Sequence, residues 1–156
     1  MNRLRLQHGA MLIQVLIGVF VAGILATVAV SSLSNFRESQ NITNSTDSVV
    51  SLLNEARART LAGDNDSQYG VRLAAGSATL FAGTTYVSGA ATNKVIALDV
   101  NTTITSISLN GGGSDVIFSQ LTGETTQYGT LIVKRSSTTE GQRTITIVRT
   151  GIISSN

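Results

Sequence analysis

The pattern of apolar and polar residues changes twice along the chain, and each part predicts a different kind of structure. Residues 10–30 form a run of twenty-one residues in which Gln14 is the one strongly polar side chain. A helix of this length measures about 31 Å, which matches the hydrocarbon core of a bilayer. The window from Leu6 to Phe36 contains no Asp, Glu, Lys or Arg. The pattern predicts one membrane-spanning helix over residues 10–30.

Beyond residue 30 the apolar positions recur at spacings of three, four and seven, which is typical of a helix buried on one face. The polar stretch 39–48 is a weak helix former, so we expect a bend or a loosened turn there. Glu55 and Arg59 form an i,i+4 pair in the favourable order, and Gly63 ends the helix. One long helix is expected over residues 10–62. Its second half should pack on a core through Leu33, Phe36, Ile42, Val49, Leu52, Leu53, Ala56 and Leu61.

From Tyr69 onward the period changes to two, and Gly and Asn residues separate the apolar runs. The expected fold class is therefore α+β, with the long N-terminal helix packed on an antiparallel β-sheet in a head of residues 63–156. The predicted strands cover residues 69–74, 78–82, 94–100, 103–109, 116–119, 128–135 and 143–149.

Composition excludes several classes of function. The 156-residue chain has no Cys and a single His, His8, so a disulfide scaffold, a thiolate metal site and a Cys nucleophile are excluded. No nucleophile–base pair remains once the first nine residues are removed, so we expect no enzyme, no cofactor and no metal. The net charge is +2, and Arg3 and Arg5 supply all of it. The rest of the chain has equal numbers of basic and acidic side chains, which argues against general binding of polyanions.

The flanking charges also predict the orientation of the helix. Arg3 and Arg5 precede the apolar run and should stay in the cytoplasm, so the head should lie outside the inner face of the membrane. A secretory signal peptide is the alternative. The run of residues 10–30 is longer than the usual apolar region of a signal peptide, and no clean A-x-A site ends it.

The short basic leader that ends at Gly9, followed by Ala10-Met-Leu-Ile-Gln-Val-Leu16, resembles a type IV prepilin-like protein. The resemblance implies cleavage after Gly9 by prepilin peptidase and N-methylation of Ala10. It further implies a single-pass protein of the bacterial inner membrane with its head in the periplasm or outside. The helix, held first by lipid, would later pack against the helices of other pilins or pseudopilins in a filament.

Three stretches of the remaining chain resemble the minor pseudopilin H and FimT group. Residues 52–61 resemble its helix-end pattern, residues 116–123 its strand followed by a turn with Gly, and residues 142–153 its closing strand with Gly. The resemblance implies a structural filament subunit of a type II secretion or type IV pilus system, at or near the filament tip.

Two features of the helix bear on assembly. Gln14 stands where the family normally has Glu, so it can form a hydrogen bond between helices but cannot supply the negative charge that the family uses. Gly18, Ala22 and Ala26 lie at i, i+4 and i+8 and form a stripe of small residues that lets a neighbouring helix approach closely. Small residues are also common in membrane helices generally, which explains the stripe equally well.

Two other functions stay open within the same architecture. Four basic residues of the final hairpin, Lys134, Arg135, Arg143 and Arg149, are candidates for holding DNA phosphates in a competence pilin of the FimT kind. Aromatic residues that would stack bases are missing there, and solvated edge-strand charges that discourage aggregation are the favoured interpretation. The second alternative is a membrane-anchored β adhesin that never enters a filament and therefore keeps residues 1–9.

Overall fold

The computed structural model describes the backbone of residues 3–136 and 141–156, and the side chains of residues 12–27, 39–136 and 141–156. The chain divides into two compact units, Met1–Glu38 and Ser39–Asn156. Helix α1 (Arg3–Leu61) contributes to both units. Within the described residues, no helix meets the length and apolarity needed to cross a bilayer. The predicted span 10–30 includes residues 10, 11 and 28–30, whose side chains lie outside the described set.

The helix is continuous through the polar stretch 39–48, so the expected bend or loosened turn was wrong. The hydroxyl of Thr43 donates to the Ser39 carbonyl at 3.1 Å, and that of Thr46 donates to the Ile42 carbonyl at 2.7 Å. Each hydroxyl shares a carbonyl of the preceding turn with the helical N–H, so both side chains are satisfied while the residue stays helical. Ile42, Ser45 and Thr46 are also buried, so packing helps to hold this weakly helix-forming stretch in a helix.

Gly63 ends the helix as expected. Its backbone is left-handed, with φ 66° and ψ 27°, and it leads into a short 3₁₀ turn, η1 (Asp64–Asp66). The Ala62 N–H donates to the Ala58 carbonyl at 2.9 Å, and the Gly63 N–H donates to the Thr60 carbonyl at 3.2 Å. A residue without Cβ adopts this conformation at little cost.

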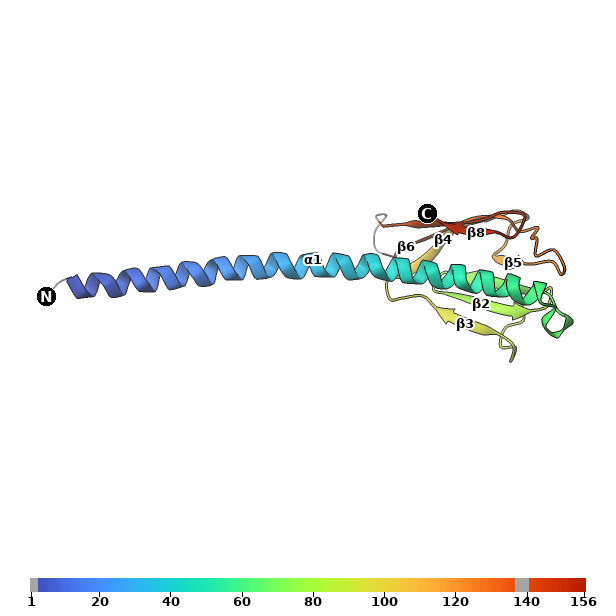
Figure 1. Cartoon of the computed structure of the whole chain (residues 1–156), viewed down its shortest axis with the longest axis horizontal. Helices are drawn as coiled ribbons and strands as arrows, with labels where there is room; N and C mark the ends of the chain where they lie inside the picture. Colours follow the sequence, from blue (N-terminus) through green and yellow to red (C-terminus); the bar gives the residue numbers. More distant parts are fainter. Residues whose placement is uncertain (1–2, 137–140) are drawn as a thin grey trace. The chain divides into compact units, whose positions relative to one another are not determined.

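The strands form two four-stranded antiparallel sheets, which confirms the α+β class and the antiparallel pairing (Figure 1). The first sheet has the order β3-β2-β1-β5, and the second has the order β4-β6-β7-β8. All seven expected strands are present, and the division into two sheets and the last strand were not anticipated. The strand bounds are β1 (Tyr69–Ala74), β2 (Ser77–Ala82), β3 (Lys94–Ala97), β4 (Thr102–Leu109), β5 (Asp115–Ile117), β6 (Gly129–Arg135), β7 (Arg143–Ile147) and β8 (Ile153–Ser155).

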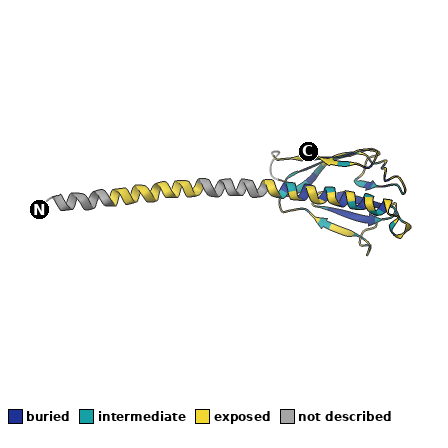
Figure 2. Cartoon of the chain, in the orientation of Figure 1, coloured by how far each residue is buried: buried dark blue, intermediate teal, exposed yellow. Residues whose placement is uncertain are grey.

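The core lies where the C-terminal part of α1 packs against the inner faces of both sheets (Figure 2). Five of the eight apolar helix positions expected in the core are buried there: Ile42, Val49, Leu52, Leu53 and Ala56. Leu61 is 43% exposed, so its expected burial was wrong, and Thr60 is buried instead. Leu33 and Phe36 lie outside the residues whose side chains are described.

A smaller cluster covers the outer face of the first sheet. Phe81 on β2 is buried, and its ring packs edge-on against Tyr86 with the ring centroids 5.6 Å apart. The Arg72 guanidinium lies over the same Tyr86 ring at 4.8 Å. Phe81 rests on Gly70, where a Cβ would lie 2.7 Å from the ring. The 83–93 segment thus closes one sheet face that would otherwise meet water.

Candidate functional site

The apolar segment of α1 over residues 12–27 presents its side chains to the surroundings. Ten large apolar side chains in this segment are between 47% and 71% exposed, and they lie on every side of the helix. Exposed apolar surface of this extent is typical of a segment that lipid or another protein covers. The exposed residues are Leu12, Ile13, Val15, Leu16, Ile17, Val19, Phe20, Val21, Ile24 and Leu25.

The predicted helix-packing residues lie within this exposed segment. Gln14, Gly18, Ala22 and Ala26 follow one another at four-residue spacing and are all exposed. A Cβ built on Gly18 would meet nothing within 4 Å. The small size of residue 18 is therefore not required by packing within the described part of this chain. The predicted processing residues Gly9 and Ala10 belong to α1, and their side chains lie outside the described set.

At the C-terminal end of α1, the structure joins the three stretches that carry the family resemblance. Arg57 Nε donates to the Gly123 carbonyl at 3.2 Å, and Arg57 Nη2 donates to the Thr150 carbonyl at 3.4 Å. Gly151 packs so closely that a Cβ there would clash with the Gly123 carbonyl oxygen. Sequence reasoning included Arg57, Gly123 and Gly151 in these stretches but assigned no contact to any of them. The signal available was that a helix-end Arg and two turn glycines occur in those three stretches.

A network of charges links the helix to the edge of the first sheet. Glu55 accepts from Lys94 Nζ at 2.7 Å and from Arg59 Nη2 at 2.8 Å, which confirms the expected Glu55–Arg59 pair. The bonds from Lys94 and then from Arg59 hold the pKa of the Glu55 carboxyl below its ordinary value, and together they exceed the opposing effect of burial. The hydrogen bond to Glu55 raises the pKa of the Arg59 guanidinium above its ordinary value.

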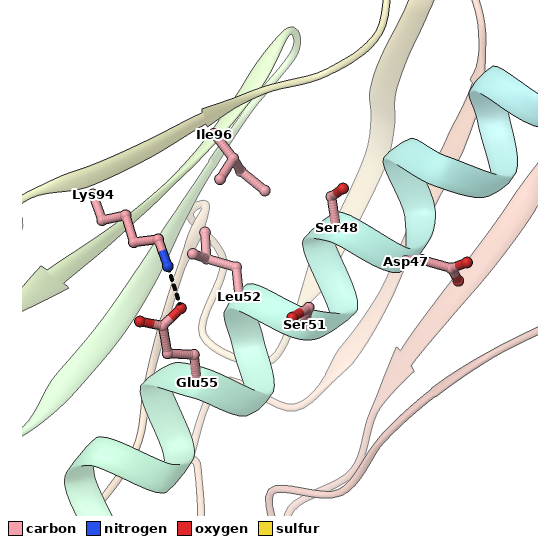
Figure 3. Close-up of a pocket in the computed structure, with 7 residues that line it drawn as sticks. All are labelled: Asp47, Ser48, Ser51, Leu52, Glu55, Lys94 and Ile96. Atoms are coloured by element: carbon pink, nitrogen blue, oxygen red, sulfur yellow. Dashed lines mark hydrogen bonds and ion pairs between the residues drawn. The ribbon is translucent and has the colours of Figure 1, made fainter.

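A groove lies beside this network, between α1 and β3 (Figure 3). Its volume is about 370 Å³. Leu52 and Ile96 form its apolar floor, and Asp47 lies at the end away from the Glu55–Lys94 pair. The hydroxyl groups of Ser48 and Ser51 complete the lining. Sequence reasoning did not predict this groove, because its two walls are about forty residues apart in the chain.

The four basic residues proposed for DNA do not form one patch. Arg143 opens β7 opposite Val133 of β6, close to Lys134 and Arg135. Arg149 follows the other end of β7, where its carbonyl accepts from the Thr125 N–H at 3.0 Å. Strand alternation places Lys134 on the outer face of the second sheet. Arg143 instead donates to Thr43 of α1 at 3.4 Å. The structure therefore brings three of the four to one end of the sheet and separates Arg149 from them.

No protein-family model and no curated protein matches the sequence. The class of the fold is nevertheless defined by its structure. A long N-terminal helix packed on antiparallel sheets, with its apolar segment exposed, makes this a protein of pilin-like fold.

Solved structures of one protein share this fold. The crystal structure of the type IV minor pilin FimU of Pseudomonas aeruginosa in space group P21 aligns with a TM-score of 0.58 and 14% identity. The alignment covers 78% of this chain and 92% of that chain. The P65 crystal form of FimU aligns with a TM-score of 0.55 and 13% identity, over 73% of this chain and 91% of that one. At these identities the likeness shows the fold.

Proposed function

We propose that this protein is a structural filament subunit, a minor pilin or pseudopilin of a type IV pilus or type II secretion system, at or near the filament tip. The pilin-like fold supports the class, and FimU, which shares the fold, is a type IV minor pilin. The observation that carries the proposal is the apolar segment 12–27, whose ten large apolar side chains are exposed. Such a surface needs a cover of lipid before assembly and of partner helices afterwards.

The mechanism in this proposal is packing and involves no chemical step by the protein itself. Prepilin peptidase removes residues 1–9 after Gly9, and Ala10 becomes the methylated N-terminus. The helix then exchanges lipid for the helices of neighbouring subunits, with Gly18, Ala22 and Ala26 at the closest approach. Because a Cβ on Gly18 would meet nothing within 4 Å in the described part of the chain, the small size of this residue is free to serve the contact.

Gln14 sets the character of the first contact with a neighbouring subunit. A buried carboxamide avoids the large desolvation penalty of a carboxylate and still donates and accepts hydrogen bonds. It supplies no negative charge to a partner's N-terminal amine. The subunit therefore enters the filament through a hydrogen bond at this position, which suits a specialised subunit present in few copies.

Processing provides the direct test. The full chain is produced with and without a prepilin peptidase, and the intact mass is measured. The proposal expects the mass of residues 10–156 plus one methyl group when the peptidase is present, and the complete chain when it is absent. A Gly9→Val variant should keep the leader in both cases. Retention of residues 1–9 by the unaltered chain would overturn the proposal and favour the non-assembling membrane-anchored adhesin.

Assembly is tested separately by crosslinking, which is simple because the chain contains no Cys. Ala22→Cys places a thiol on the small-residue stripe, and Phe20→Cys places one about 160° away around the helix. We expect crosslinks to candidate pilins from Ala22→Cys in preference to Phe20→Cys. The same pair is then compared in a Gln14→Glu background, in which a charge-based contact would strengthen crosslinking.

A further inference from the structure

The groove between α1 and β3 is bordered by a strand edge that no other strand in the described part of the chain covers. β3 pairs with β2 alone. The Leu98 N–H donates to the Gly76 carbonyl at 3.0 Å, which fixes the alternation of the antiparallel ladder. By this alternation the N–H and C=O groups of Val95 and Ala97 point away from β2. They face the open edge as unused donors and acceptors.

This edge lacks the features that usually prevent strand addition. Natural edge strands are protected by proline, bulges or charged side chains held in the solvent. The chain contains no Pro, and the pairing of β2 with β3 is regular. The one charged residue of β3, Lys94, is turned toward α1 and bound to Glu55 at 2.7 Å. Val95, which faces the other side of the sheet, is 62% exposed.

The groove has the place and the chemistry that side chains of an added strand require. A strand hydrogen-bonded to Val95 and Ala97 would lie about 4.8 Å beyond β3, and alternate side chains would point toward α1. They would meet the apolar floor of Leu52 and Ile96, which the Ser48 and Ser51 hydroxyls border. The remaining side chains would lie beside Val95 on the outer face.

Charge indicates what such a strand would carry. Glu55 is neutralised by Lys94 and Arg59, whereas the Asp47 carboxylate at the other end of the groove is exposed and has no ion pair among the described residues. The groove therefore has one uncompensated negative charge at its rim. A long basic side chain on an added strand is the charge complement of this carboxylate.

We propose that the α1–β3 groove is a docking site for an extended polypeptide segment that adds a fifth strand at the edge of β3. The segment is alternating in pattern, with apolar side chains over Leu52 and Ile96 and a Lys or Arg that pairs with Asp47. Main-chain hydrogen bonds to Val95 and Ala97 supply affinity, and the groove supplies selectivity. This site is separate from the proposed filament contacts, because those contacts lie in the unit Met1–Glu38 and the groove lies in the unit Ser39–Asn156.

The test uses the full chain in detergent and the acetylated, amidated peptide Thr-Val-Thr-Ile-Thr-Lys-Thr as probe. We expect binding with a Kd below about 1 mM and slower hydrogen exchange at the Val95 and Ala97 amides. Ala97→Pro removes the outward N–H without removing a bond to β2, and it should weaken binding at least tenfold. Ala97→Ser keeps the N–H and is the matched control. Asp47→Asn should also weaken binding tenfold, whereas Asp66→Asn should not.

Three outcomes would overturn the proposal. The first is no binding at peptide concentrations up to about 5 mM. The second is equal binding to the Ala97→Pro and Ala97→Ser variants, since strand addition requires the edge N–H. The third is equal binding of N-acetyl-lysine amide, which would indicate that the groove takes a free cation. Circular dichroism of each variant establishes that a loss of binding is not a loss of folding.

Discussion

Arg57 and Gly123 are joined by a hydrogen bond of 3.2 Å from the guanidinium Nε to the main-chain carbonyl, across sixty-six positions of sequence. The same guanidinium reaches the Thr150 carbonyl at 3.4 Å. One helix side chain thus satisfies the carbonyls of two turns, which accept no other hydrogen bond from the described residues. Since Gly151 packs against Gly123, the end of the helix, the 119–124 turn and the 148–152 turn form one junction.

The junction predicts a large effect of truncating Arg57. Arg57→Ala should lower the free energy of unfolding by about 1–3 kcal/mol, because a charged donor to two carbonyls is lost. Urea unfolding followed by circular dichroism measures the change. Arg149→Ala removes an exposed guanidinium nearby and should change stability by less than about 0.5 kcal/mol. Equal effects of the two variants would show that the junction is not held by Arg57.

A methyl group at Gly70 should disrupt the outer cluster of the first sheet. In Gly70→Ala the new Cβ would lie 2.7 Å from Phe81 Cζ and 2.8 Å from the Val116 carbonyl oxygen, so the ring and the strand must both shift. We expect a loss of about 1–3 kcal/mol in the free energy of unfolding. Gly76→Ala is the control, since its Cβ would meet nothing within 4 Å. A Gly70→Ala variant as stable as Gly76→Ala would contradict the packing described for Phe81.

The ion-pair network predicts a loss of stability in acid. The pKa of Glu55 is lowered in the folded protein, so its contribution is complete above the ordinary value of 4.5 and is lost as the pH falls through the folded value. Unfolding midpoints in urea measured from about pH 6 to about pH 3 should therefore decline less steeply for Glu55→Gln than for the unaltered chain. Glu124→Gln, at an exposed position without these cations, should keep the unaltered slope.

Enlarging Gly18 should impair assembly and leave folding unchanged. Gly18→Ile has no neighbour to displace within the described part of the chain, so the unfolding midpoint should be that of the unaltered protein. If partner helices approach along the small-residue stripe, the variant should be recovered in the sheared filament fraction at least tenfold less than the unaltered protein. Gly23→Ile makes the same chemical change about 140° away around the helix. Equal recovery of the two variants would show that partner helices do not pack along the small-residue stripe.

The periodicity of the sequence located most elements, because local spacing reflects which face of each element is buried. Periodicity failed at Leu61, whose place in the apolar spacing predicts burial although the side chain is 43% exposed. The buried side chain there is Thr60, whose hydroxyl donates to the Ala56 carbonyl and accepts from the Tyr69 N–H, each at 2.9 Å. A polar residue is buried because two hydrogen bonds satisfy it, and such partners are not visible in a one-dimensional pattern.

Features that depend on distant pairing were not predictable either. β5 joins the first sheet beside β1, whereas β4, which precedes it in the chain, pairs with β6 in the second sheet. Strand order of this kind is decided by three-dimensional packing. The groove at β3 and the junction at Arg57 join residues that are distant in sequence, so they were recognised only in the structure. The pilin-like fold, in contrast, was implied by the resemblance of the N-terminal pattern to prepilins.

The placement of α1 at the centre of the core has a consequence for biosynthesis. The ribosome delivers the helix first, whereas β7, which contributes the buried Ile145 and Ile147, is completed only near the end of the chain. Until then the apolar stripe around Leu53 and Ala56 has no complete cover. The nascent polypeptide is therefore exposed to aggregation for most of its translation, and we expect a chaperone to hold it during this interval.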